Sequence, residues 1–232
     1  MPALTTPRCL TITVAVAFVP AVMPASSSAA LISFGSTLKA SANITKAHQA
    51  DTAFWQTKLP AGKSPRAPAN GQIKSFKVKG IAKSSWKPGS AVGGERMFHL
   101  QTLRRQANGK YKILVTTQAF FLPGRGTPSQ TISSYRPINF CVAKGDYVVF
   151  NTVGGWDGIA NRTGPYPDGT PLQIFSKATG STVAEYTKAD GTNNGDIIRA
   201  KSGPGTGHEL LMQLTVGTGT NATGLCPGGT GR

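Results

Sequence analysis

Short runs of β-forming residues separated by turn-forming residues recur through most of this chain, and this pattern restricts its fold more than any other feature. The residues Tyr111, Ile113, Val115 and Thr117 form an apolar or β-branched face at a spacing of two, as in a strand with one buried side. Segments such as Lys144-Gly145-Asp146 supply the positive φ angles that tight turns require. The runs that we predict as strands cover residues 72–81, 97–105, 111–121, 130–142, 146–152, 172–176, 182–187 and 209–216.

The composition supports an all-β fold. The chain has 28 Gly and 16 Pro among 232 residues, which suits many turns, and only 15% charged residues, which argues against long exposed helices. Hydrophobic residues make up 39%, enough for a real core. We therefore predict a two-sheet antiparallel β-sandwich of jelly-roll or immunoglobulin-like type.

The first thirty residues have the layout of a secretory signal peptide. They carry a single charge at Arg8, an apolar run over 9–23 and small residues over 24–30. The apolar run is shorter than the roughly 20 residues of a membrane-spanning helix, and a retained membrane anchor is therefore the less favoured alternative. We expect cleavage near Leu31 and a secreted, extracellular protein with no membrane span.

The remaining chain shows no internal repeat of fixed period and divides by pattern into three parts. Residues 31–70 are predicted to be a lead-in segment with one strand near 53–58. Residues 71–226 are predicted to form the β-sandwich domain, and residues 227–232 a C-terminal tail.

Two cysteines remain after removal of the signal peptide, which contains Cys9. An isolated pair in an oxidising compartment predicts one disulfide, here between Cys141 and Cys226. This bond would tie the C-terminal tail to the domain. The alternative is two unpaired thiols.

Positive charge is concentrated in one part of the sequence. Residues 39–112 contain 15 Lys and Arg against Asp51 and Glu95, a balance of +13, whereas residues 113–232 contain 9 against 7, a balance of +2. A basic surface of this kind can hold acidic polymers by attraction that salt weakens. The alternative is a solvated strand face with basic loops. No motif for sequence-specific recognition of nucleic acid is present.

Enzyme motifs are missing from the sequence. There is no Gly-x-Ser-x-Gly, no His-Glu-x-x-His, no phosphate-binding loop and no dinucleotide fingerprint. Glu95, Glu185 and Glu209 do not form the clustered pattern of glycosidase carboxylates. We therefore predict a protein without catalytic residues, although a hydrolase whose site escapes motif search is a further alternative.

The segment from Asp190 to Asp196 is rich in oxygen-bearing side chains and resembles the start of a calcium loop. The twelfth position counted from Asp190 is Lys201, where an EF-hand loop has a bidentate Glu. We predict a hairpin turn here, with a Ca²⁺ site as the alternative, and no other metal or cofactor.

Aromatic residues in turn-rich sequence are the best signal of a ligand site. Trp156 and Tyr166 lie among Gly, Pro and Asp, where rings can stack on a sugar while acidic and amide groups bind its hydroxyls. The alternative is that Trp156 covers one end of the core. The ligand-binding residues that we predict are Trp156, Asp157, Asn161, Tyr166, Asp168 and Asp190.

Several segments spread over residues 50–226 form a set that can be compared with known families. They are residues 52–56, 68–73, 140–147, 150–155, 191–195 and 209–213, with the sequences TAFWQ, PANGQI, FCVAKGDY, FNTVGG, GTNNG and ELLMQ. Together they resemble a family of uncharacterised secreted proteins of actinobacteria. This resemblance implies a β-sandwich and brings no catalytic residues with it.

These observations lead to one functional expectation and its alternatives. We expect a secreted, non-catalytic β-sandwich protein that binds an extracellular or cell-wall polymer, either a glycan or a polyanion. The main alternative is a structural or interaction protein of the cell envelope or spore surface. A secreted hydrolase is the third.

Overall fold

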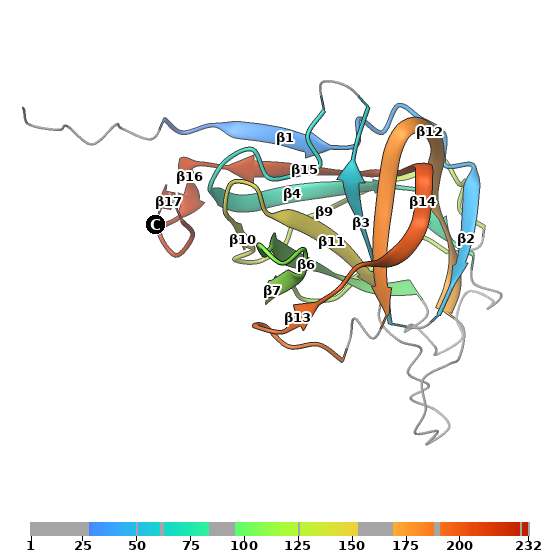
Figure 1. The fold of residues 1–232 in the computed structure, drawn as a ribbon. Coiled ribbons are helices and arrows are strands. Elements are labelled where there is room, and N and C mark those ends of the chain that lie inside the picture. The colour runs from blue at the N-terminus through green and yellow to red at the C-terminus, as the bar shows by residue number, and fades with distance from the viewer. Residues whose placement is uncertain are drawn as a thin grey trace, which may run out of the picture.

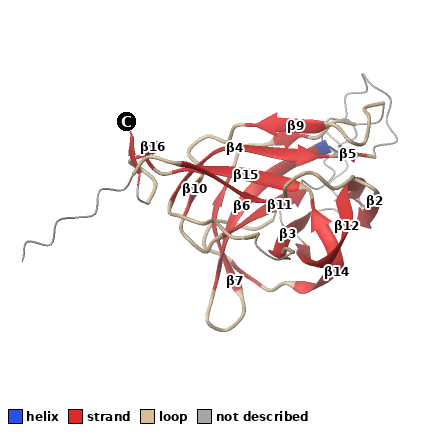
Figure 2. Ribbon diagram, turned by 90° about the horizontal axis from the view of Figure 1, so that it is seen from above, coloured by secondary structure: helices blue, strands red, loops and turns tan. Residues whose placement is uncertain are grey.

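The computed structural model describes residues 28–49, 51–60, 63–83, 96–124, 126–152, 169–187, 191–227 and 229–231. Strands and their connecting loops make up nearly all of this part of the chain, as Figure 2 shows. Two large antiparallel sheets pack against each other (Figure 1). The predicted all-β, two-sheet antiparallel sandwich is therefore confirmed.

The smaller of these two sheets, which we call sheet A, has five strands. Its order is β1 (Leu31–Gly35), β15 (Met212–Gly217), β4 (Gly71–Lys79) and β10 (Cys141–Val142), and β9 (Ile132–Tyr135) also pairs with β4. Phe76 and Val78 of β4 point into the sandwich, whereas Lys77 between them is exposed. This alternation leaves the outer face of sheet A polar.

The larger sheet, sheet B, has ten strands. Its order is β13 (Ile197–Ile198), β7 (Tyr111–Thr116), β6 (Met97–Arg105), β11 (Tyr147–Thr152), β3 (Thr52–Lys58), β12 (Gly169–Thr187) and β14 (Lys201–Leu210). Off this path, β2 (Ile44–His48) and β5 (Ile81–Ala82) pair with β12, and β8 (Phe120–Phe121) pairs with β6. Only Arg199 and Ala200 separate the two strands at its edges, β13 and β14, so the sheet must curl strongly.

The curl of sheet B creates a second hydrophobic core. The main core lies between the sheets and includes Phe54, Phe76 and Phe150. On the opposite face of sheet B, Trp55 packs edge-on against Tyr111 and Tyr186, with ring centroids 5.3 Å and 6.0 Å apart. Trp55 is completely buried there. Sheet B is thus apolar on both faces.

The strand predictions need several corrections. The predicted runs 111–121 and 130–142 each contain two strands, β7 with β8 and β9 with β10, and the predicted run 209–216 crosses from the end of β14 into β15. Residues 31–70 contain three strands, β1, β2 and β3, where one was predicted, and β3 lies inside sheet B. The predicted strands 172–176 and 182–187 are joined in the 19-residue β12, because β14 pairs with residues on both sides of the irregular stretch between Lys177 and Thr182. The tail beyond 226 contains β17 (Gly229–Gly231), which pairs in parallel with β16 (Gly219–Thr223).

A buried amide joins three strands of sheet B. The Gln56 side chain accepts the Leu210 N–H at 2.7 Å and donates to the carbonyls of Lys58 and Thr182 at 2.6 Å and 3.1 Å. Leu210 belongs to β14 and Thr182 to β12, so this one side chain satisfies backbone groups where both strands meet β3.

The predicted bond between Cys141 and Cys226 is present, with the two Cα atoms 5.2 Å apart. It connects β10 of sheet A to the turn that follows β16. Residues 1–27 of the predicted signal peptide, which covers residues 1–30, lie outside the described residues. In the part of the chain that the structure describes, no helix is long and apolar enough to cross a membrane.

Removing the disulfide should destabilise the protein. The bond joins residues 85 apart in sequence, for which loop closure in the unfolded chain corresponds to about 4 kcal/mol, and we expect a measured loss of about 2–4 kcal/mol. Urea unfolding of the oxidised wild-type protein and of the variant Cys141→Ser/Cys226→Ser measures this loss of unfolding free energy. A reducing agent should bring the wild-type protein to the same value and leave the variant unchanged. Equal stability of oxidised protein and variant would contradict the prediction.

The half-buried His48 should make stability depend on pH. Burial lowers its pKa from 6.5, the positive charge of Lys46 adds to this, and the carbonyls of Gln49 and Thr170 and the carboxylate of Glu185 oppose it. Because the unfolded chain then binds the proton more readily, the contribution is complete above pH 6.5 and is lost as the pH falls through the folded pKa. We expect His48→Gln to flatten the rise of unfolding free energy with pH just below 6.5. An identical pH profile in the variant would show that other groups produce it.

Candidate polyanion-binding site

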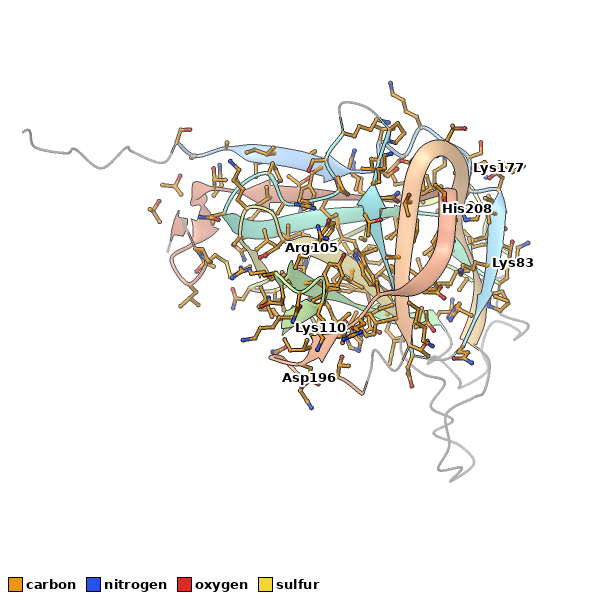
Figure 3. All side chains as sticks on the ribbon, viewed as in Figure 1. Lys83, Arg105, Lys110, Lys177, Asp196 and His208 are labelled. Carbon is orange, nitrogen blue, oxygen red and sulfur yellow. A yellow bond between two sulfur atoms is a disulfide. The ribbon has the colours of Figure 1, made fainter. Side chains whose placement is uncertain are left out.

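The surface of the described residues is strongly unbalanced in charge. Every described Lys and Arg is exposed except Lys46, Lys79 and Lys110, whereas Asp196 is the one exposed carboxylate among these residues. Figure 3 shows this distribution, with cations projecting from many sides of the molecule. The basic sequence therefore becomes a basic surface.

The few carboxylates are largely used inside the fold. Asp146 is buried and accepts both the Nε–H of Arg104 at 2.8 Å and the Nη2–H at 2.9 Å. Glu185 forms an ion pair with Lys46 at 3.1 Å. Glu209 is buried and its Oε1 atom has no hydrogen-bond partner. These groups leave most exposed cations without an acidic neighbour.

One group of cations lies where β6 and β7 approach the turn before β11. We call it the basic end. Its register places Arg104 opposite Lys112 and Arg105 opposite Tyr111 across the β6–β7 hairpin. The hairpin is closed by the Gln106 N–H, which donates to the Lys110 carbonyl at 2.8 Å. The members of the basic end are Arg66, Arg104, Arg105, Lys110, Lys112 and Lys144.

A loop from a distant part of the chain brings Arg66 to this group. Its Nε–H donates to the Tyr147 hydroxyl oxygen at 2.8 Å, and the guanidinium carbon lies 5.0 Å from the centre of the Tyr147 ring. The Ala67 N–H donates to the Asp146 carbonyl at 2.8 Å, and the Gly145 N–H donates to the Ala67 carbonyl at 2.9 Å. These bonds fix the loop to the turn that also carries Lys144.

The pKa shifts agree with this arrangement. Burial raises the pKa of the Tyr111 hydroxyl, and nearby Tyr147 raises it further, while Arg105 and Arg66 partly oppose the shift. Both guanidinium groups are therefore close enough to act on the same phenol. The hydrogen bond to Asp146 raises the pKa of Arg104. Asp146 neutralises Arg104, and the other five cations of the basic end have no such partner in the described part of the chain.

The six predicted ligand-binding residues, Trp156, Asp157, Asn161, Tyr166, Asp168 and Asp190, lie outside the described residues. β11 precedes the segment that contains Trp156 to Asp168, and β12 precedes Asp190. These two strands end side by side. β11 ends at Thr152, whose Oγ1 accepts the Thr52 N–H at 3.0 Å, and β12 ends at Thr187, which pairs with the same Thr52. This edge of sheet B is at the opposite end of β11 from the basic end.

A group of buried polar side chains lies near this edge and was not predicted. The Tyr186 hydroxyl donates to Gln101 Oε1, and burial raises the pKa of Tyr186 to about 12. Gln101 also donates to Thr116 Oγ1 at 3.3 Å. Asn151 is buried with neither amide atom hydrogen-bonded. The available signal was that Asn151 directly follows the apolar run Val148-Val149-Phe150 and that Gln101 follows Leu100 within β6.

The segment proposed as a turn or a calcium loop is described from residue 191 onward. The Asp196 carboxylate accepts the Asn193 N–H at 2.8 Å, and Gly195 has a φ of 104°, as a tight turn requires. Asp190 lies outside the described residues. Within the described ranges, no three His, Cys, Asp or Glu side chains are grouped to hold a metal ion.

Comparison of the chain with models of protein families, with curated proteins and with solved structures finds no match.

Arg104 should stabilise the protein through its ion pair with Asp146. Arg104→Met leaves the buried Asp146 carboxylate with the Ala143 N–H, which it accepts at 2.8 Å, but without its cation. We expect a loss of about 1–3 kcal/mol in unfolding free energy, measured by chemical denaturation. Arg105→Met, which removes an unpaired cation next to it, should change stability by less than about 0.5 kcal/mol. Equal losses of unfolding free energy in Arg104→Met and Arg105→Met would show that the ion pair between Arg104 and Asp146 has no special role.

Proposed function

We propose that this protein is secreted, has no catalytic role, and binds acidic extracellular polymers at its basic end. The sequence supports secretion through its signal-peptide layout, and the resemblance to secreted actinobacterial proteins agrees with it. The absence of enzyme motifs from the sequence favours binding over catalysis. The proposal rests most directly on the cations of the basic end, which have almost no carboxylates to neutralise them.

The charges of the basic end suit a polymer that carries a negative group on each repeating unit. Six cations from β6, β7 and two loops lie at one end of sheet B, and in the described part of the chain Arg104 alone among them is paired with a carboxylate. A polymer that contacts them releases its condensed counterions, which favours binding without reading a particular sequence. Arginine is well suited to carboxylate, sulfate and phosphate groups because its planar guanidinium offers several donors in a fixed geometry.

Rigidity supports the same proposal. The rings of Tyr111 and Tyr147 lie 5.9 Å apart, and Trp55 packs against Tyr111 beneath them. Arg66 stacks over Tyr147, so its guanidinium is held in place before any ligand binds. A preorganised cation costs less entropy on binding than a free side chain does.

Retention on heparin should weaken steeply with salt and depend on the basic end. We expect Arg105→Gln/Lys110→Gln to elute at lower salt than the wild-type protein and to reduce the slope of log affinity against log salt by about 2. The matched control is Lys83→Gln/Lys177→Gln, which removes the same charge from the other side of the view in Figure 3.

The two variants separate local binding from net charge. A clearly smaller shift for the control supports binding at the basic end. Equal shifts for both pairs would mean that total charge alone holds the polymer. Retention that does not change up to roughly 0.5 M salt would contradict a screened electrostatic mechanism.

A further inference from the structure

A pocket of about 390 Å³ opens at the end of β1, between this strand, β15 and the loop 63–68. This volume falls within the range of roughly 300 to 1,000 Å³ that is typical of small-molecule sites. Hydroxyl, amide and ammonium groups line it: Ser33, Ser36, Thr37, Lys63, Ser64 and Gln213. No carboxylate is among the lining residues. The chemistry of this wall therefore suits a ligand with many hydroxyls and a negative charge.

The backbone around the pocket is firmly held. The Gly35 N–H donates to the Ser64 carbonyl at 3.1 Å, and the Ser36 N–H donates to the Met212 carbonyl at 2.8 Å. Gly35 has a φ of 86°, and a Cβ atom at this position would lie 2.7 Å from the Met212 carbonyl oxygen. Only glycine allows this close approach of β1 to β15. The pocket is thus built into the sheet rather than formed by mobile side chains.

Three lining side chains are available to a ligand. The Ser64 hydroxyl is already used, since it accepts the Arg66 N–H at 3.1 Å and donates to the Arg66 carbonyl at 3.0 Å. Among the described residues, by contrast, the side chains of Thr37, Lys63 and Gln213 form no hydrogen bond or ion pair. They offer a hydroxyl, an ammonium and an amide to the same space.

The polar surface continues from the pocket across sheet A. Gln213 is paired with Lys77 of β4, and Lys77 is paired with Ser134 of β9. Ser33 is paired with Thr215, and their hydroxyl oxygens are 3.3 Å apart. Side chains directly opposite in an antiparallel pair are close neighbours, so Lys77 lies beside the pocket.

The loop that closes the pocket also reaches the basic end. Lys63 and Ser64 line the pocket, while Arg66, which contacts Tyr147, is a member of the basic end. Lys63 and Arg66 are three residues apart, which limits the distance between their Cα atoms to about 11 Å. One polymer chain can therefore touch both places.

We propose that this pocket binds one sugar unit of an acidic glycan, with its anionic group at Lys63 and its hydroxyls at Thr37 and Gln213. This inference rests on the proposed function and names its substrate class. Single-stranded nucleic acid is less suited, because base binding relies on exposed aromatic rings and the only aromatic lining residue, Phe34, is buried. Acidic polypeptides such as poly-glutamate lack the hydroxyl groups that we assign to the Thr37 and Gln213 side chains.

The test compares binding of oligogalacturonate, a heparin tetrasaccharide, poly-glutamate and single-stranded DNA to the secreted protein. The variant Thr37→Val/Gln213→Val removes the hydroxyl and the amide and keeps the charge. We expect it to weaken binding of the acidic oligosaccharides about tenfold or more and to leave retention of poly-glutamate unchanged. The matched control is Thr45→Val/Gln49→Val, two exposed residues that do not line the pocket. Circular dichroism verifies that each variant is folded.

The outcomes distinguish the pocket from the basic end. Loss of oligosaccharide binding with retained poly-glutamate binding supports the pocket, and the carboxylated and sulfated oligosaccharides show which anionic group Lys63 prefers. Equal effects on all four ligands, or no effect on any, would overturn the pocket and leave the proposed function standing. A variant that loses only DNA would also overturn it. If the wild-type protein binds the oligosaccharides but retains neither poly-glutamate nor DNA, and Arg105→Gln/Lys110→Gln binds the oligosaccharides as the wild type does, the proposed function fails and the pocket alone survives.

Discussion

The organisation of the basic end depends on one buried carboxylate. Asp146 holds the Arg104 guanidinium with two hydrogen bonds, accepts the Ala143 N–H within its own turn, and through its backbone carbonyl accepts the Ala67 N–H. It thereby connects β6, the turn before β11 and the loop that carries Arg66. A chain with 9 acidic residues against 25 basic ones uses this acid for structure, which leaves its neighbouring cations free for a ligand.

Much of the sandwich was predictable, because its strands have one buried and one exposed side. The alternation that begins at Tyr111 appears in the structure as buried Tyr111 and Ile113 with Lys112 exposed between them. β2 was missed because it pairs only with β12 and has a largely polar sequence with no fully buried residue. The predicted division of β12 corresponds to its partners, since β2 pairs with it only up to Phe175 and β3 only from Thr182, whereas β14 pairs on both sides of the irregular stretch between them.

The candidate site was predictable in composition but not in position. The charge balance of residues 39–112 indicated a basic surface, and the single cysteine pair indicated the disulfide. Sequence could not show that Arg66 meets Tyr147, or that Arg104 meets Asp146, since these contacts join residues 81 and 42 positions apart. The pocket beside β1 was equally hidden, because its lining comes from β1, β15 and the loop 63–68, which are far apart along the chain.

The most direct test of the account is to map where an acidic polymer touches the folded protein. Backbone amide chemical shifts recorded during titration with a heparin oligosaccharide report this residue by residue. We predict that the largest changes fall at Arg66, Arg105, Lys112 and Lys144. Changes centred on Lys83 and Lys177, or spread evenly over all exposed cations, would contradict a binding site at the basic end.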